Sequence, residues 1–100
     1  MKERILIIED DEGIVNVLKR GLTYEGYQVD IAYNGESGLV AARTYHPDLV
    51  LLDLIMPGLD GFEFLRRLRA DAQTAQTPVL IVTATDLYDD LLKRHGITDV

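Results

Sequence analysis

The sequence predicts an α/β fold in which helices cover both faces of a parallel β-sheet. Three observations support this prediction. Short apolar segments alternate with amphipathic segments, so that a strand is followed by a helix four times along the chain. The strand segments are apolar at consecutive positions, which is typical of strands buried on both faces. The length of 100 residues, of which 47% are hydrophobic, fits one domain. Right-handed crossovers then favour a doubly wound sheet.

The first strand is predicted at residues 5–8, where four large aliphatic residues follow one another. Apolar residues then recur at helical spacing between residues 14 and 22, and Gly26 closes that helix. Residues 27–32 form the second predicted strand. Each segment has the length expected of its type.

The Asn-Gly pair at residues 34–35 predicts a turn or a helix start, and the helix that follows continues to about Tyr45. Pro47 sets the next boundary, because the residue before a proline avoids helical geometry. Residues 49–52 are then a third buried strand.

Residues 57–61, Pro-Gly-Leu-Asp-Gly, are predicted as a loop from their composition. Phe62, Leu65 and Leu68 mark a third helix, and its exposed side carries Arg66, Arg67 and Arg69. Pro78 precedes a fourth strand at residues 79–82. A last helix is predicted at residues 87–95, because acidic residues lie at its start, basic residues at its end and a glycine after it.

Polar side chains follow three of these strands where each one ends. Glu9 and Asp10 follow the first strand, Asp53 the third and Thr83 the fourth. In the flavodoxin-like strand order 2-1-3-4-5 these three strands are neighbours, and ligands bind beyond their carboxyl ends. Clustered carboxylates favour a hard cation, so we predict a Mg²⁺ site at Asp10 and Asp53, with Glu9 acting through water.

Asp53 stands alone in an apolar segment, which makes it the better candidate for a nucleophile toward phosphorus. The Thr83 hydroxyl would then bond a phosphoryl oxygen. The simpler alternatives stay open at this point. An acidic cluster after a strand often only starts a helix, as Asp11 or Glu12 could do here, and an aspartate that ends a strand is commonly a loop or capping residue.

Residues 2–11, KERILIIEDD, and residues 47–68, PDLVLLDLIMPGLDGFEFLRRL, resemble the receiver domain of bacterial two-component response regulators. The resemblance implies that Glu9 and Asp10 are the family's acidic pair and that Asp53 is its phosphorylation site. It also implies that the backbone carbonyl of Ile55 binds Mg²⁺ and that Thr83 is the switch hydroxyl. The phosphoryl donor would be a sensor histidine kinase or a histidine phosphotransfer protein, and the receiver would catalyse only its own phosphorylation and dephosphorylation.

The chain also departs from the family pattern. The family's lysine at the end of the fifth strand would fall about three residues past Val100. We therefore expect residues 1–100 to be one receiver domain, incomplete at its carboxyl end, with the fifth strand incomplete and the last helix missing. Such a chain would be the front of a longer protein or a shortened one. The open edge would invite pairing, and a homodimer stays open.

Composition restricts the partners further. Seventeen acidic against ten basic residues give a net charge of −7, which disfavours nucleic-acid binding by this chain alone. The absence of cysteine excludes disulfides and thiolate metal sites. The longest nearly apolar segment, residues 49–56, is too short to span a bilayer, and no signal-peptide pattern is present. We therefore expect a cytoplasmic protein with no membrane partner.

Three other functions are alternatives to the phosphorylation switch. A phosphatase using an aspartyl phosphate needs a second aspartate two residues after the nucleophile, where this chain has Ile55. A flavodoxin-like cofactor binder needs a phosphate-binding loop after the first strand, where this chain has four acidic residues. A degenerate receiver, acting as a protein-interaction module without phosphorylation, is the remaining alternative.

Overall fold

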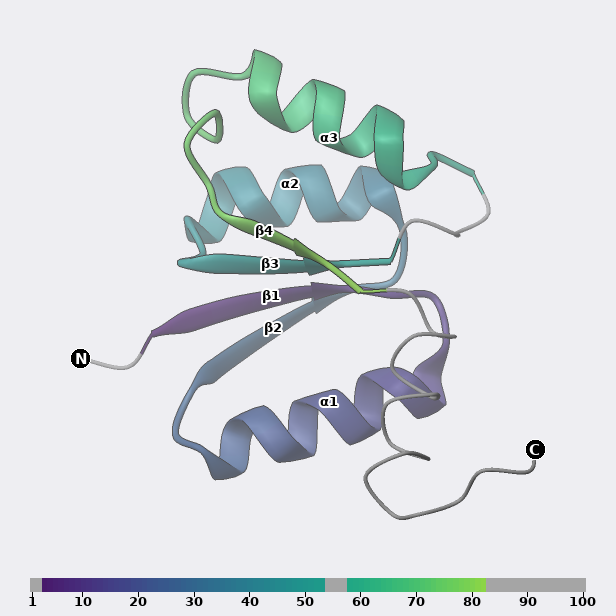
Figure 1. The fold of residues 1–100 in the computed structure, drawn as a ribbon, viewed down its shortest axis with the longest axis vertical. Coiled ribbons are helices and arrows are strands. Elements are labelled where there is room, and N and C mark those ends of the chain that lie inside the picture. The colour runs from purple at the N-terminus through teal and green to yellow at the C-terminus, as the bar shows by residue number, and fades with distance from the viewer. Residues whose placement is uncertain (1–2, 54–57, 83–100) are drawn as a thin grey trace.

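The computed structural model describes residues 3–53 and 58–82. Four parallel strands form one sheet in the order β2-β1-β3-β4, as Figure 1 shows. The strands are β1 (Arg4–Ile8), β2 (Gln28–Ala32), β3 (Leu49–Leu52) and β4 (Val79–Ile81). This order confirms the predicted doubly wound topology over the described part of the chain. The predicted helix at 87–95 and the start of a fifth strand at 97–100 lie outside the described residues.

Three helices connect these strands. They are α1 (Glu12–Tyr24), α2 (Gly35–Tyr45) and α3 (Gly61–Ala70). α1 lies on one side of the sheet, whereas α2 and α3 lie together on the other side (Figure 1). This placement buries both faces of the central strand β1, whose last four residues are all buried.

The predicted boundaries differ from the observed ones by about one residue. Gly61, predicted as part of a loop, is the first residue of α3 because the Asp60 carboxylate accepts the backbone N–H of Glu63 at 2.8 Å. β2 begins one residue later than predicted, and β4 ends one residue earlier. Gly26 follows α1 with a φ of +97°, which a residue with a side chain rarely adopts.

The larger part of the core lies between the sheet and the pair α2 and α3. It consists of side chains that are at most 4% exposed, contributed by three strands and both helices: Leu6, Ile8, Ala32, Ala42, Val50, Leu52, Phe64 and Leu68. On the other face of β1, Ile5 and Ile7 are buried as well. This two-sided burial fixes the register of β1 and therefore the residue at which it ends.

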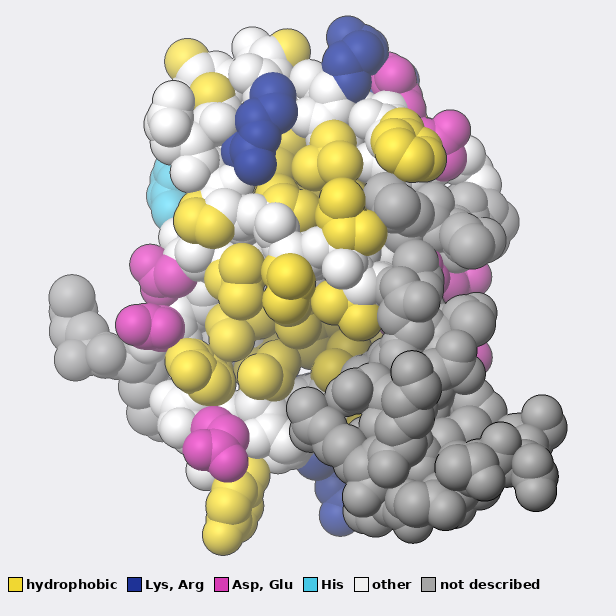
Figure 2. Space-filling view, in the orientation of Figure 1, with side chains coloured by type: hydrophobic (Ala, Val, Ile, Leu, Met, Phe, Trp, Pro, Cys, Tyr) yellow, Lys and Arg dark blue, Asp and Glu magenta, His cyan; other side chains and the backbone are white. Residues whose placement is uncertain are grey.

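Apolar side chains remain exposed on and beside β4. Leu80 is 53% exposed and Ile81 is 46% exposed. Figure 2 shows apolar side chains gathered over the middle of the face on which β4 lies in front. In the described part of the chain β4 pairs only with β3 and forms one edge of the sheet.

Candidate functional site

The carboxyl ends of β1 and β3 lie side by side because these strands pair in parallel, with Ile8 opposite Leu52. The residues that follow are Glu9 and Asp10 after β1 and Asp53 after β3. The backbone N–H of Asp53 donates to the carbonyl oxygen of Ile8 at 3.1 Å, which ties the two strand ends together. One carboxylate oxygen from each of the three acids lies within 4.8 Å of the others. The structure thus brings the three predicted acidic residues into one cluster.

Glu9 is held by hydrogen bonds on both sides of the strand end. Its backbone N–H donates to the carbonyl of Ala32 at 3.1 Å, and its Oε1 accepts the backbone N–H of Asp11 at 3.1 Å. Glu9 is only 4% exposed. This burial, together with the negative charge of Asp53, raises the pKa of Glu9 to about 7 although the Asp11 amide acts in the opposite direction.

Asp53 is equally buried, at 4% exposed, whereas Asp10 is exposed to solvent. The cluster therefore has two carboxyl groups at the end of the sheet and one at its rim.

The donor set fits a hard divalent cation. All three side chains offer oxygen ligands, and Mg²⁺ is bound in proteins by one or two carboxylates completed by water. Burial is the larger cause of the raised pKa of Glu9 and the negative charge of Asp53 a smaller one, and a cation bound at the cluster would stabilise the charged carboxylates against both effects. The cluster of the three acids could therefore hold a metal ion.

Two predicted site residues, Ile55 and Thr83, lie outside the described residues. The alternative that an acid in this stretch starts a helix is confirmed for Asp11, whose Oδ1 accepts the N–H groups of Gly13 at 2.8 Å and Ile14 at 3.2 Å. Sequence reasoning missed the hydrogen bond from the Asp11 amide to Glu9. The sequence does show that Glu9 stands two residues before the helix cap Asp11, but this spacing does not show that the Glu9 side chain points toward the Asp11 amide.

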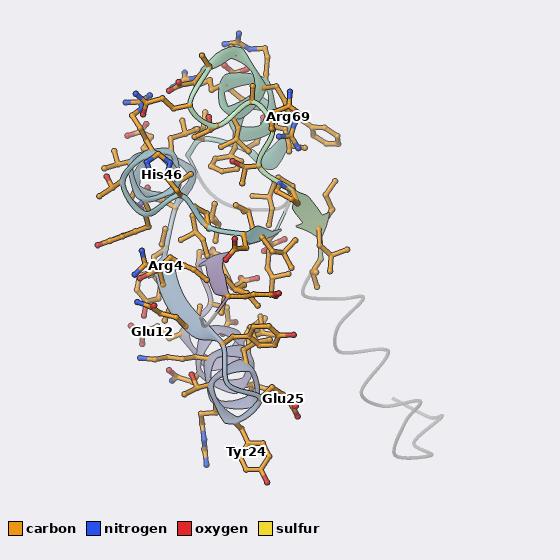
Figure 3. The ribbon with its side chains drawn as sticks, turned by 90° about the vertical axis from the view of Figure 1, so that its left-hand side faces the viewer. Arg4, Glu12, Tyr24, Glu25, His46 and Arg69 are labelled. Carbon is orange, nitrogen blue, oxygen red and sulfur yellow. The ribbon has the colours of Figure 1, made fainter. Side chains whose placement is uncertain are left out.

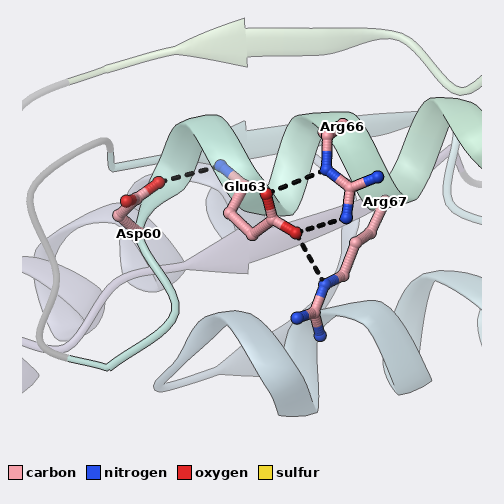
Figure 4. A network of polar contacts seen from close by, with 4 residues as sticks. All are labelled: Asp60, Glu63, Arg66 and Arg67. Carbon is pink, nitrogen blue, oxygen red and sulfur yellow. Dashed lines mark hydrogen bonds and ion pairs between the residues drawn. The ribbon is translucent and has the colours of Figure 1, made fainter.

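Three arginines in other parts of the fold have partners of their own. Figure 3 shows the end of the sheet at which the strands begin. Arg4 lies there, beside the end of α2. The arginines of α3 were predicted as a solvated helix face, and Figure 4 shows Arg66 and Arg67 paired with Glu63 on that helix. No helix among the described residues is long and apolar enough to cross a membrane.

Comparisons with known proteins show which family and fold the chain resembles. Residues 5–97 match the family model of the response regulator receiver domain. The chain is 52% identical over 89 residues to the uncharacterized transcriptional regulatory protein YkoG of Bacillus subtilis, covering 89% of this chain and 38% of that protein. It is 44% identical over 98 residues to protein PilH of Pseudomonas aeruginosa, covering 96% of this chain and 81% of PilH. The chain thus spans well under half of the YkoG protein.

Solved structures resemble the fold over most of its length. The N-terminal domain of a response regulator receiver protein from Methanoculleus marisnigri has a TM-score of 0.79 and 38% identity, covering 94% of this chain and 76% of that one. The receiver domain of the sensor histidine kinase PA1611 of Pseudomonas aeruginosa, solved with a magnesium ion in its active-site cleft, has a TM-score of 0.80 and 28% identity, covering 91% and 75%. A response regulator, TrrA, was solved in complex with the histidine kinase ThkA; that structure has a TM-score of 0.74 and 36% identity, covering 82% and 69%.

Proposed function

The chain belongs to the response regulator receiver domain family, and on that premise we propose that it is a phosphorylation-controlled signalling switch with Asp53 as the phosphoryl acceptor. Members of this family act in phosphorelay signalling. The observation that carries the proposal is the cluster of three carboxylates within 4.8 Å at the carboxyl end of the sheet.

Asp53 is the nucleophile in this proposal. Its Oδ forms a bond to the phosphorus of a phosphohistidine while the phosphorus–nitrogen bond breaks and the imidazole leaves with a proton from solvent. Burial and the backbone tie to Ile8 hold this carboxylate at the end of β3, which presents it to a donor arriving at the rim. A fixed acceptor increases the rate of transfer, because the carboxylate loses less orientational freedom when it reaches the reactive geometry.

The neighbouring residues would complete the site. Asp10, Asp53 and the carbonyl of Ile55 would hold Mg²⁺, and Glu9 would contribute through a bound water. Bound Mg²⁺ would neutralise the charge that builds up on the phosphoryl oxygens. The Thr83 hydroxyl would bond one of those oxygens and transmit the change of state. The magnesium ion coordinated in the active-site cleft of the PA1611 receiver supports Mg²⁺ as the bound cation.

The proposed phosphoryl donor is a sensor histidine kinase or a histidine phosphotransfer protein. The complex of TrrA with the kinase ThkA supports this class of partner. The receiver would catalyse only its own phosphorylation and dephosphorylation, and it would act in the cytoplasm.

Acetyl phosphate provides a direct test. The chain is incubated with acetyl phosphate with and without Mg²⁺, and its intact mass is measured. We expect one phosphoryl adduct that requires Mg²⁺ and is lost in Asp53→Asn. The matched control is Asp60→Asn, because asparagine caps a helix as well as aspartate does and the α3 start should be kept.

The result separates the two functions. An adduct that survives Asp53→Asn would overturn the assignment of the acceptor. The absence of any adduct in the wild-type chain would favour the interaction module without phosphorylation.

A further inference from the structure

Asp11 joins the acidic cluster to the first turn of α1. Its backbone N–H donates to Oε1 of Glu9 at 3.1 Å. Its Oδ1 accepts the backbone N–H groups of Gly13 at 2.8 Å and Ile14 at 3.2 Å. Its carbonyl oxygen accepts the backbone N–H of Val15 at 3.0 Å. The amide of Asp11 thus contacts the cluster, whereas its other two polar groups hold the start of the helix.

The hydrogen bonds to α1 hold the backbone of Asp11 in place. The first N–H groups of a helix have no partner within the helix, and a capping side chain supplies one. Asp11 has the extended backbone of such a cap, with φ −88° and ψ 113°. Because its amide nitrogen is bonded to the same Cα as the anchored groups, the cap also limits the directions that the N–H can take.

The Asp11 amide restrains the side chain of Glu9, whose backbone is already held elsewhere. The Glu9 N–H donates to the carbonyl oxygen of Ala32 at 3.1 Å. A glutamate side chain still has several rotatable bonds, and restricting them costs conformational entropy. A donor at Oε1 restrains them before a cation arrives. A backbone N–H also favours the charged form of a carboxylate, which is the form that binds a cation.

The restrained carboxylate belongs to the cluster itself. One oxygen from each of Glu9, Asp10 and Asp53 lies within 4.8 Å of the others. Glu9 is also buried, at 4% exposed. The direction of its carboxylate therefore decides how far its oxygens lie from a cation bound by the other two acids.

We propose that Asp11 is a positioning residue for the metal site at the acidic cluster. By capping α1, its side chain holds its backbone N–H toward Glu9, and this N–H sets the direction of the Glu9 carboxylate. Asp11 itself is not a ligand. The inference rests on the proposed function, because it concerns a site that holds Mg²⁺. Groups that orient the ligands of a metal without contacting it commonly control its affinity.

Calorimetric titration with Mg²⁺ tests the inference without phosphorylation. Asp11→Ala removes the side chain that caps α1 but keeps the amide, so Mg²⁺ binding should weaken by about three- to tenfold. Asp11→Asn should stay within about twofold of the wild type, because asparagine caps a helix as well as aspartate does. Both variants lose the charge of Asp11, so the difference between them measures the effect of the cap.

A matched control separates positioning from loss of stability. Asp60→Ala removes the same kind of cap from α3, where the Asp60 carboxylate accepts the N–H of Glu63 at 2.8 Å. Both alanine variants should unfold at a lower temperature than the wild type. Measured where both are folded, Asp60→Ala should keep the wild-type Mg²⁺ affinity and Asp11→Ala should not.

A double-mutant cycle tests whether Asp11 acts through Glu9. Glu9→Ala removes the carboxylate that accepts the Asp11 amide. Asp11→Ala should therefore weaken Mg²⁺ binding less in the Glu9→Ala background than in the wild type. Asp11→Gly serves if Asp11→Ala does not fold, because glycine at a cap costs little helix stability and has no side chain to anchor it.

Each outcome separates this inference from the proposed function. Wild-type Mg²⁺ affinity in Asp11→Ala and Asp11→Gly would overturn the inference and leave the proposed function standing. So would an equal loss of affinity in Asp11→Asn or Asp60→Ala, or an undiminished effect of Asp11→Ala in the Glu9→Ala background. If the wild-type chain itself does not bind Mg²⁺, both the proposed function and this inference are wrong.

Discussion

Asp11 donates its backbone N–H to the carboxylate of Glu9 at 3.1 Å. The carboxylate of Asp11 accepts the backbone N–H of Gly13 at 2.8 Å and so caps α1. Three consecutive acids therefore have three different environments. Glu9 is buried and hydrogen-bonded, Asp10 is exposed at the rim of the cluster, and Asp11 belongs to the helix. The three acids therefore have different structural roles, although all three carry the same type of group.

This division predicts different results for two identical substitutions. Asp10→Asn removes a charged group that we propose as a metal ligand, so Mg²⁺ affinity should fall by about tenfold or more. Asp11→Asn keeps a side-chain oxygen that caps a helix equally well, so both stability and Mg²⁺ affinity should change little. Calorimetric titration and thermal unfolding measure the two quantities. Equal losses of Mg²⁺ affinity in the two variants would show that Asp10 has no special role.

Two glycines predict opposite changes in stability for the same substitution. Gly21 lies inside α1 with open space around it, so Gly21→Ala should raise the free energy of unfolding by about 0.5–1 kcal/mol. Gly38 lies inside α2, where a β-carbon would be 2.7 Å from Ile8 Cδ1 and 3.2 Å from Phe64 Cε2. Gly38→Ala should therefore lower the free energy of unfolding by about 1–3 kcal/mol, because the added methyl group overpacks the core.

Urea unfolding of both variants at neutral pH is the measurement. A stabilised Gly38→Ala would mean that Ile8 turns aside at little cost, and the close packing of α2 on β1 would then not constrain this position.

The positions of β1 and β3 could be predicted from the sequence, because strands buried on both faces need apolar residues at every position. Residues 49–52 show this directly, since the predicted strand and β3 coincide. The cluster of Glu9, Asp10 and Asp53 followed from the order alone, because parallel strands bring their carboxyl ends to one edge.

What the sequence does not carry is the direction and neighbourhood of individual side chains. The start of α3 at Gly61 depends on a hydrogen bond from the Glu63 amide to Asp60, and a loop-like composition hides it. The contact of Gly35 with Leu59 joins residues 24 positions apart, so no local pattern contains it. The close packing of Gly35 against Leu59 is therefore seen only in the three-dimensional structure.

Glu63 predicts a pH dependence of stability. Hydrogen bonds from Arg66 and Arg67 lower the pKa of Glu63 to about 2 from 4.5 (Figure 4). Because the folded state holds this carboxylate in its charged form, its contribution to stability is present above pH 4.5 and is lost as the pH falls from 4.5 toward 2.

The unfolding temperature of the wild type and of Glu63→Gln, measured between pH 6 and pH 2.5, checks this. The wild type should be the more stable at pH 6, and the difference should shrink as the pH falls. Since Glu63 and both arginines are on the surface, 1 M salt should reduce the difference at pH 6 as well. A difference that does not change with pH would assign the effect to something other than this charge.

Arg4 predicts a loss of stability that leaves the acidic cluster intact. At the amino-terminal edge of the sheet its Nε lies 3.1 Å from Asp30 Oδ2, an oxygen that is buried and has no aligned hydrogen bond, and its guanidinium lies 5.2 Å from the centre of the Tyr45 ring. Arg4→Met should lower the free energy of unfolding by about 1–3 kcal/mol, because Asp30 then keeps its charge without a partner. Arg4→Met/Asp30→Asn should recover part of that loss, and Mg²⁺ affinity should stay at the wild-type value in both variants.

Urea unfolding and calorimetric titration measure the two quantities. A double variant no more stable than Arg4→Met would show that packing of the Arg4 stem, and not its charge, stabilises this edge.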